Sequence, residues 1–228
     1  MTKCEKDLET YKRLAKQVMH PIPPLDSELW FLDDSTAQAG QVDYHYTLQD
    51  IWAAQLVHKS NVPKHHDVGS RLEGFITHCL CFTSVVMLDI RPSSLRLDNL
   101  EFIQTDATTL TGIPDQSIQS LSCLHAAEHF GLGRYGDPIC PDGHVRLMKS
   151  LQRVLAKNGF LYFSVPVGFE KTVFNALRIF NPKTIVDTFN ELTILDFKVN
   201  NSGIKSFPHW SQYSLREQDC GLFLFTRK

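Results

Sequence analysis

The fold is decided by the stretch HHDVGSRLEGFITHCLCFTSVVMLDI (65–90), in which a strand, a helix and a second strand follow one another. Residues 65–69 form a short expected strand that ends in glycine, and residues 72–82 have helical spacing. The run 84–90 is rich in β-branched residues, as is typical of a buried parallel strand. Such a unit predicts a doubly wound parallel sheet.

The same alternation continues toward the C-terminus. Further strands are expected at 100–105, 118–124 and 160–165, and further helices at 144–156 and 182–189. Two last strands, 193–199 and 222–226, have no crossover helix between them and should therefore be antiparallel. The sequence predicts an α/β, Rossmann-like fold with a mostly parallel seven-stranded sheet and an antiparallel C-terminal edge hairpin.

The first sixty residues do not show the strand–helix alternation. Residues 7–19 have the spacing of one amphipathic helix, and residues 47–58 predict a second helix that Thr47 caps. Between them, residues 21–44 carry turn formers and scattered aromatic residues, which predicts an irregular lid or linker. We therefore expect a helical N-terminal extension with this lid or linker (1–60) and a ligand-binding domain (61–228).

Composition narrows the class of protein. The 228 residues are 43% hydrophobic, enough for one well-filled core, and the net charge of −2 gives no basic field for nucleic acid. We expect a small-molecule substrate and no nucleic-acid partner. No apolar run is long enough to span a membrane, and the N-terminus lacks a secretory signal. Six cysteines without a CxxC pair favour free thiols and a cytoplasmic protein, whose oligomeric state stays open.

The residue that follows each expected strand is a candidate ligand contact, because ligands of open α/β sheets bind beyond the carboxyl ends of the strands. After the first strand, a glycine lets a ligand approach the backbone and the next helix offers free N–H groups. An aspartate about twenty residues later suits the two ribose hydroxyls of a nucleoside. A third acidic residue can accept from an adenine amino group. The candidates are Asp67, Gly69, Ser70 and Arg71, then Asp89 and Ile90, then Asp106 and Ala107.

This order of motifs, together with LSCLHAAEHF (121–130) and LQRVLAKNGFLYFSVP (151–166), resembles class I methyltransferases that use S-adenosyl-L-methionine (SAM). Within them, HFGLGRYGDPICPDGH (129–144) and FNPKTIVDTF (180–189) resemble a small bacterial family of uncharacterised methyltransferase-like proteins. The resemblance covers about residues 61–228. It implies SAM as the cofactor, with Leu124 also at its site, and a small polar acceptor such as a sugar or nucleotide-linked sugar.

The first loop departs from the family pattern. Arg71 stands where these enzymes usually have a second glycine. Its side chain must point away from the cofactor or pair with the cofactor's carboxylate.

A rival motif overlaps the fourth strand end. His125, Glu128 and His129 match the H-x-x-E-H pattern of inverted zinc metallopeptidases. Zinc would need both histidines on one helical face, and Gly131, Gly133 and Gly136 break a helix here. His65 and His66 alternate across a strand and cannot chelate from one face. We therefore expect no metal.

Beside a methyl donor, the same three residues are candidate catalytic groups. A hydroxyl acceptor needs a positioned base to remove its proton, and His129 is the first choice, with Glu128 and His125 as further candidates. Alternatively, Glu128 and His129 only anchor the helix and the loop through hydrogen bonds.

The glycine-rich stretch after them is a candidate substrate loop, with Arg134, Tyr135 and Asp137 as contacts. The alternative is a tight structural turn with surface charges. The leading hypothesis is a methyltransferase, followed by a non-catalytic SAM-fold module that binds a ligand or partner. A nicotinamide dehydrogenase comes third, because G-x-G-x-x-G is missing, and a zinc peptidase last.

Overall fold

The computed structural model describes residues 3–17, 19 and 37–228, and it divides the chain into two units, residues 1–42 and 43–228. The division does not fall at residue 60, as the sequence predicted. The reason is that helix α2 (Tyr44–Ser60) buries Trp52 and Val57 in the core of the second unit. Residues 21–36 of the expected lid or linker lie outside the described residues.

The first unit contains helix α1, Lys3–Ala15. The sequence predicted this helix over residues 7–19, so the helix begins and ends four residues earlier. Glu5 lies in its first turn and Lys12 and Arg13 in its last, a charge order that favours these ends through the helix dipole.

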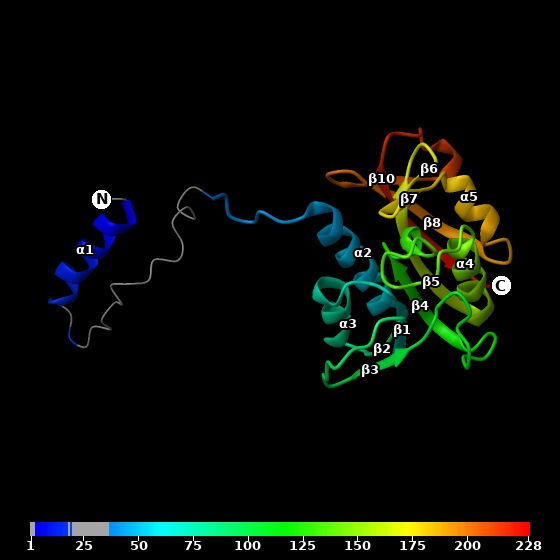
Figure 1. The fold of residues 1–228 in the computed structure, drawn as a ribbon, viewed down its shortest axis with the longest axis horizontal. Coiled ribbons are helices and arrows are strands. Elements are labelled where there is room, and N and C mark those ends of the chain that lie inside the picture. Colours follow the sequence, from blue (N-terminus) through cyan, green and yellow to red (C-terminus); the bar gives the residue numbers. More distant parts are fainter. Residues whose placement is uncertain (1–2, 18, 20–36) are drawn as a thin grey trace. The chain divides into compact units, whose positions relative to one another are not determined.

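The second unit is built on an eight-stranded sheet in the order β3-β2-β1-β4-β5-β10-β8-β9 (Figure 1). Strands β1 to β5 run parallel to one another, and β10 pairs antiparallel with both β5 and β8. The parallel strands are β1 (Lys64–Val68), β2 (Ser84–Asp89), β3 (Leu100–Gln104), β4 (Ile118–Leu124) and β5 (Leu155–Val167). The expected α/β fold and the antiparallel C-terminal edge are confirmed.

The sheet has one strand more than expected. Strand β9 (Ile204–Phe207) lies in the segment that the sequence predicted to be a loop. It pairs with β8 (Thr193–Asn200) and forms the edge of the sheet, because β10 (Asp219–Thr226) pairs with the other side of β8. A separate antiparallel hairpin, β6 (Lys171–Val173) and β7 (Leu177–Ile179), follows β5. Short turns η3 (Ala127–His129) and η4 (Trp210–Gln212) complete this part.

Helices cover both faces of the sheet (Figure 1). On one face, α2 and the segment η2 (Leu72–Ile76) with α3 (Thr77–Leu80) bury Trp52 and Phe75 against Leu124. On the other face, α4 (Gly143–Val154) and α5 (Pro182–Thr188) bury Leu151 and Phe189. Burial of apolar side chains on both faces holds the carboxyl ends of the parallel strands in one row.

Two helices differ from expectation. The helix predicted over residues 72–82 is interrupted, because Glu73 and Gly74 have non-helical backbone angles, with φ of 99° at Gly74. The start of α2 is set by Asp43 and not by Thr47. The Asp43 carboxylate accepts from the backbone N–H of His45 at 3.0 Å and of Tyr46 at 3.4 Å. No helix among the described residues is long and apolar enough to cross a membrane.

Candidate functional site

A cavity of about 880 Å³ opens at the carboxyl ends of β1 to β4, where the sequence placed the ligand. Each of these strands contributes the residues that follow it, and the N-terminal end of α2 contributes its cap, Asp43, with His45 and Tyr46. The walls are formed by residues 69–73 after β1, 87–91 at and after β2, 106–109 after β3, and 125–126 and 128–131 after β4. The loop residues Arg134, Tyr135 and Asp137 also line it.

The loop after β1 is fixed from behind by Asp67. This carboxylate is fully buried, and it accepts from the hydroxyl of Ser70 at 2.6 Å, the N–H of Ser70 at 3.0 Å and the hydroxyl of Ser122. Burial raises the pKa of Asp67 to about 6, although the hydrogen bonds from Ser122 and Ser70 lower it. Asp67 does not line the cavity, and its direct contact with a cofactor stays a prediction. It positions Gly69 and Ser70, which do line the cavity.

The carboxylate at the end of β2 faces the cavity and is already paired. Arg91 donates to Asp89 from Nε to Oδ1 at 2.9 Å and from Nη2 to Oδ2 at 2.6 Å. The Arg91 guanidinium also lies over the ring of Tyr135, 4.7 Å from its centroid. Asp89 is 8% exposed and lines the cavity. A ribose diol would share or displace this arginine.

The third strand end supplies a second carboxylate. Oδ1 of Asp106 accepts from the N–H and the hydroxyl of Thr108, both at 2.8 Å. Both bonds use the same oxygen, so Oδ2 is left to accept from a ligand. Ala107 lines the cavity beside it, as does Ile90 after β2. This pair suits an adenine ring with its amino group.

Arg71 points toward α2. Its guanidinium lies 4.6 Å from the centre of the Tyr46 ring and 3.6 Å from the carboxylate of Glu73. Arg71 therefore lines the cavity with its side chain directed toward Tyr46 and Glu73. It remains available to an anionic group of a ligand.

His129 presents one free ring nitrogen. Its Nδ1 donates to the carbonyl of Ala176 at 2.7 Å, which leaves the lone pair on Nε2. Nε2 lies 3.7 Å from Oε1 of Glu128. Burial lowers the pKa of His129, although the Glu128 carboxylate raises it. A neutral imidazole with a fixed tautomer can act as a general base.

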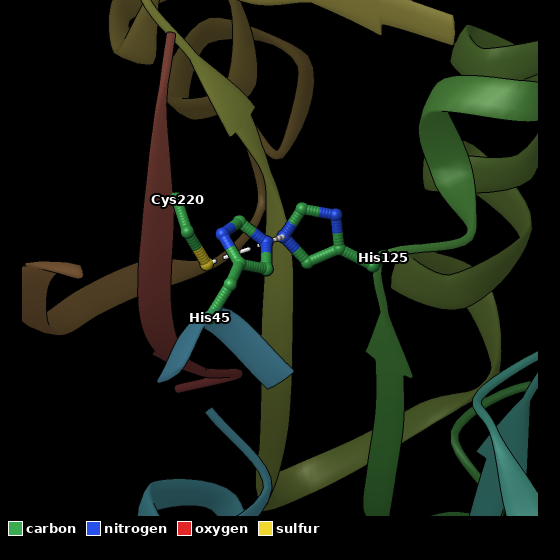
Figure 2. A group of neighbouring side chains, drawn as sticks. All are labelled: His45, His125 and Cys220. Atoms are coloured by element: carbon green, nitrogen blue, oxygen red, sulfur yellow. Dashed lines mark hydrogen bonds between the residues drawn. The ribbon is translucent and has the colours of Figure 1, made fainter. Parts of the chain in front are cut away.

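His125 faces three partners at the end of β4. Its Nδ1 lies 2.8 Å from Oε1 of Glu128, and its Nε2 lies 2.7 Å from Nε2 of His45 and 3.2 Å from Sγ of Cys220. Figure 2 shows that His45 comes from α2 and Cys220 from β10, and that both side chains lie on the same side of His125. Burial lowers the pKa of His125, but the neighbouring Cys220 and Glu128 outweigh burial and raise it. Burial and His125 lower the pKa of His45 to about 4.

The loop after η3 is held by Asp137 and Arg178. The Asp137 carboxylate accepts from the backbone N–H of Gly131 at 2.7 Å, Gly133 at 3.3 Å and Tyr135 at 3.1 Å. The buried guanidinium of Arg178 donates to the carbonyl of Phe130 at 2.6 Å. Asp137 thus shapes the turn, as in the structural alternative, while Arg134 and Tyr135 present their side chains to the cavity.

The structure brings most of the sequence-predicted site together. Leu124 is the second exception after Asp67, because it is buried in the core on the α2 face and does not line the cavity. Sequence reasoning missed four residues at or beside the cavity: His45, Tyr46, Arg91 and Cys220. Only Arg91 carried a local signal, since it lies two residues after a carboxylate at a strand end.

Part of the chain matches the model of one protein family. The family described as Caenorhabditis protein of unknown function, DUF268, matches residues 114–202, which run from the start of β4 to the end of β8. The sequence pointed to a bacterial family of methyltransferase-like proteins, whereas this description names Caenorhabditis and assigns no activity. No curated protein matches the chain in sequence.

Solved structures of low sequence identity resemble most of this chain in fold. The N-methyltransferase NodS from Bradyrhizobium japonicum, in complex with S-adenosyl-L-homocysteine (SAH), has a TM-score of 0.58 at 14% identity, covering 96% of this chain and 98% of that one. A 1,6-didemethyltoxoflavin-N1-methyltransferase from Burkholderia thailandensis has a TM-score of 0.53 at 12% identity, covering 80% and 79%. The [4+2]-cyclase SpnF has a TM-score of 0.55 at 14% identity, covering 78% and 81%. The chain therefore has the class I methyltransferase fold.

Proposed function

We propose that the protein is a SAM-dependent methyltransferase acting on a small polar acceptor. One observation carries this proposal. The cavity joins two strand-end carboxylates, Asp89 and Asp106, with a histidine, His129, that lines the same space and whose Nδ1 is held by the carbonyl of Ala176. The fold shared with enzymes whose structures hold SAH supports it.

The residues after β1 to β3 fit the cofactor. Gly69 has φ of 69°, and a Cβ there would lie 3.1 Å from the Cβ of Ala126, so a side chain would crowd the wall where the cofactor approaches the backbone. Asp89 would accept from the ribose hydroxyls, Asp106 from the adenine amino group, and Arg71 would pair with the carboxylate. SAM supplies an already activated methyl group when bound.

The chain's task on the acceptor side is to orient it and remove a proton. His129 accepts the acceptor's proton at Nε2, while Ala176 holds Nδ1 and Glu128 stabilises the charged ring. Arg134 donates to the same carbonyl at 3.0 Å and keeps its remaining N–H groups for an anionic group. A sugar or nucleotide-linked sugar would use both the base, His129, and the cationic Arg134. All six thiols are free, which supports a reducing compartment such as the cytoplasm.

Calorimetric titration tests the proposal. SAM and SAH should bind with micromolar affinity, and NAD should not bind. Asp89→Asn should weaken SAM binding tenfold or more, because a charge-assisted hydrogen bond pair is lost. Asp98→Asn is the matched control, since Asp98 is exposed and lies outside the cavity lining. Release of SAH in the presence of a panel of sugars and nucleotide-linked sugars then identifies the acceptor.

The second candidate is a non-catalytic module on the same fold. The Arg91–Asp89 pair favours it, because this pair satisfies the carboxylate that a ribose would need. Absence of SAM and SAH binding in the titration would support the module and contradict the methyltransferase.

A further inference from the structure

Three donor atoms converge at the end of the cavity next to α2. His45 lies in the first turn of α2, His125 directly after β4, and Cys220 on β10. Nε2 of His45, Nε2 of His125 and Sγ of Cys220 all lie within 4.8 Å of one another. Figure 2 shows the two rings pointing toward each other with the sulfur beside them. These three residues are distant in sequence, so only the tertiary fold brings their ligand atoms together.

The three atoms meet in a buried hydrogen-bond network that a cation can replace. The Glu128 carboxylate only accepts, so the His125 Nδ1 that faces it at 2.8 Å carries the hydrogen. Without a metal, Nε2 of a protonated His125 donates to Nε2 of His45 at 2.7 Å, with Sγ of Cys220 at 3.2 Å. Loss of that proton and of the Cys220 thiol proton leaves a lone pair on each of the three atoms, and a cation bound by all three would use them.

The separations are close to those of a zinc site. Tetrahedral zinc with Zn–N of about 2.0–2.1 Å and Zn–S of about 2.3 Å places its nitrogens about 3.3 Å apart, and nitrogen and sulfur about 3.6 Å apart. The observed 2.7 Å and 3.2 Å are shorter by roughly half an ångström. A bound ion would therefore require the three side chains to move apart by roughly half an ångström. Two imidazoles and a thiolate form a ligand set that zinc accepts.

The surroundings also suit a cation. Metal-bound histidines usually donate their second N–H to a carboxylate, as His125 does to Glu128. Glu128 is 2% exposed, and its Oε2 has no partner among the described residues. Cys220 is fully buried, so a thiolate there would need a nearby positive charge. His45 and His125 line the cavity, which leaves a fourth coordination position open toward it.

We propose that His45, His125 and Cys220 bind one Zn²⁺ ion whose open position faces the cavity. The sequence predicted no metal, since the H-x-x-E-H pattern cannot supply two histidines from one helical face. The proposed site uses His125 but not His129, and it takes its other two ligands from α2 and β10. It stands independently of SAM binding.

Cobalt titration of the chelator-treated full-length protein tests the site. One equivalent of Co²⁺ should produce the visible bands of tetrahedral cobalt together with a near-ultraviolet thiolate-to-cobalt charge-transfer band. One equivalent of Zn²⁺ should abolish both. These signals require neither SAM nor an acceptor, so their failure is distinct from failure of the proposed function. Absence of the bands in the unmodified protein would overturn the inference.

Variants assign the ligands. Cys220→Ser should remove the charge-transfer band, and His45→Gln should weaken cobalt binding tenfold or more. His45→Gln covers the case in which a change at the buried Cys220 prevents folding, since His45 is only partly buried. Glu128→Gln should keep the bands but weaken binding by about 10–100-fold. Cys81→Ser and His58→Gln are matched controls on exposed residues and should change nothing. Bands that survive in both Cys220→Ser and His45→Gln would contradict the site.

Discussion

The guanidinium of Arg91 holds both carboxylate oxygens of Asp89 and at the same time lies over the ring of Tyr135. One arginine thus connects the expected ribose position with the loop on the acceptor side of the cavity. The Arg91 side chain is half exposed, so the ion pair contributes modestly to stability.

Removal of the Arg91 charge should tighten cofactor binding. An exposed ion pair is worth about 0–1 kcal/mol, so Arg91→Gln should raise SAM affinity by up to about fivefold by freeing the Asp89 carboxylate. Calorimetry with SAM measures the change, and Arg96→Gln, outside the cavity lining, is the control. Weaker binding would mean that Arg91 itself contacts the cofactor.

Removal of the candidate base should separate turnover from binding. His129→Ala should lower kcat by about 10²–10⁴-fold, because the acceptor's proton loses its base. SAM affinity should stay nearly unchanged, since His129 lies apart from the residues after β1 to β3 that would hold SAM. SAH release and calorimetry measure the two effects. Equal losses in both would give His129 a structural role.

The cap of α2 should contribute measurably to stability. Asp43→Ala removes the carboxylate that accepts from His45 and Tyr46, which should cost about 0.5–2 kcal/mol of unfolding free energy. Thr47→Ala, inside the first turn, is the paired control and should cost less. Thermal unfolding followed by circular dichroism compares them, at about 2–4 °C for each kcal/mol. A larger loss for Thr47→Ala would restore Thr47 as the cap.

The buried His65 should make the protein less stable in acid. Burial lowers its pKa to about 3, and its ring nitrogens bond the hydroxyls of Ser120 at 2.7 Å and Ser122 at 2.8 Å. Between pH 6.5 and about 3 the unfolded chain binds a proton at this histidine that the folded chain excludes. Stability from this group is therefore complete above pH 6.5 and falls by up to about 1.4 kcal/mol per pH unit below it.

Urea unfolding of the wild type and of His65→Gln over this pH range isolates the effect. Asp67 works in the opposite direction between about pH 4 and 6, because its pKa is raised to about 6 in the folded state. The difference between wild type and variant removes the contributions of titrating groups that share no hydrogen-bond partner with His65, whereas Asp67 shares Ser122 with it. An exposed-histidine variant, His209→Gln, should follow the wild-type curve. Parallel curves for wild type and His65→Gln would contradict the prediction.

The parallel strands were predictable because their signal is local. Strand β4 has the predicted bounds, 118–124, and β1 to β3 differ by a residue at one or both ends. Buried parallel strands are short continuous apolar runs, and their carboxyl ends must share one edge of the sheet. The carboxylates of Asp89 and Asp106 could therefore be placed at one cavity from sequence alone.

The remaining features depend on distant neighbours. Gly74 adopts a positive φ where the Asp50 carboxylate of α2 approaches, so the apolar spacing of residues 72–82 does not give one continuous helix. Asp67 was predicted to contact the ligand, but its carboxylate is buried beneath the cavity lining and bonds Ser122 of β4. His45 and Cys220 meet His125 across 80 and 95 residues of sequence. The local periodicity of the sequence does not predict contacts between such distant residues.

The hairpin of β6 and β7 supplies the carbonyl of Ala176, which fixes the tautomer of His129, yet it pairs with no strand of the large sheet except through an isolated bridge beside it. Under the proposed function, the histidine that takes the proton follows β4 but is oriented by a segment outside the sheet that carries Asp89 and Asp106. A changed hairpin sequence would then reorient His129 without altering the β1–β4 scaffold, so sequence divergence among relatives is expected to concentrate in the hairpin.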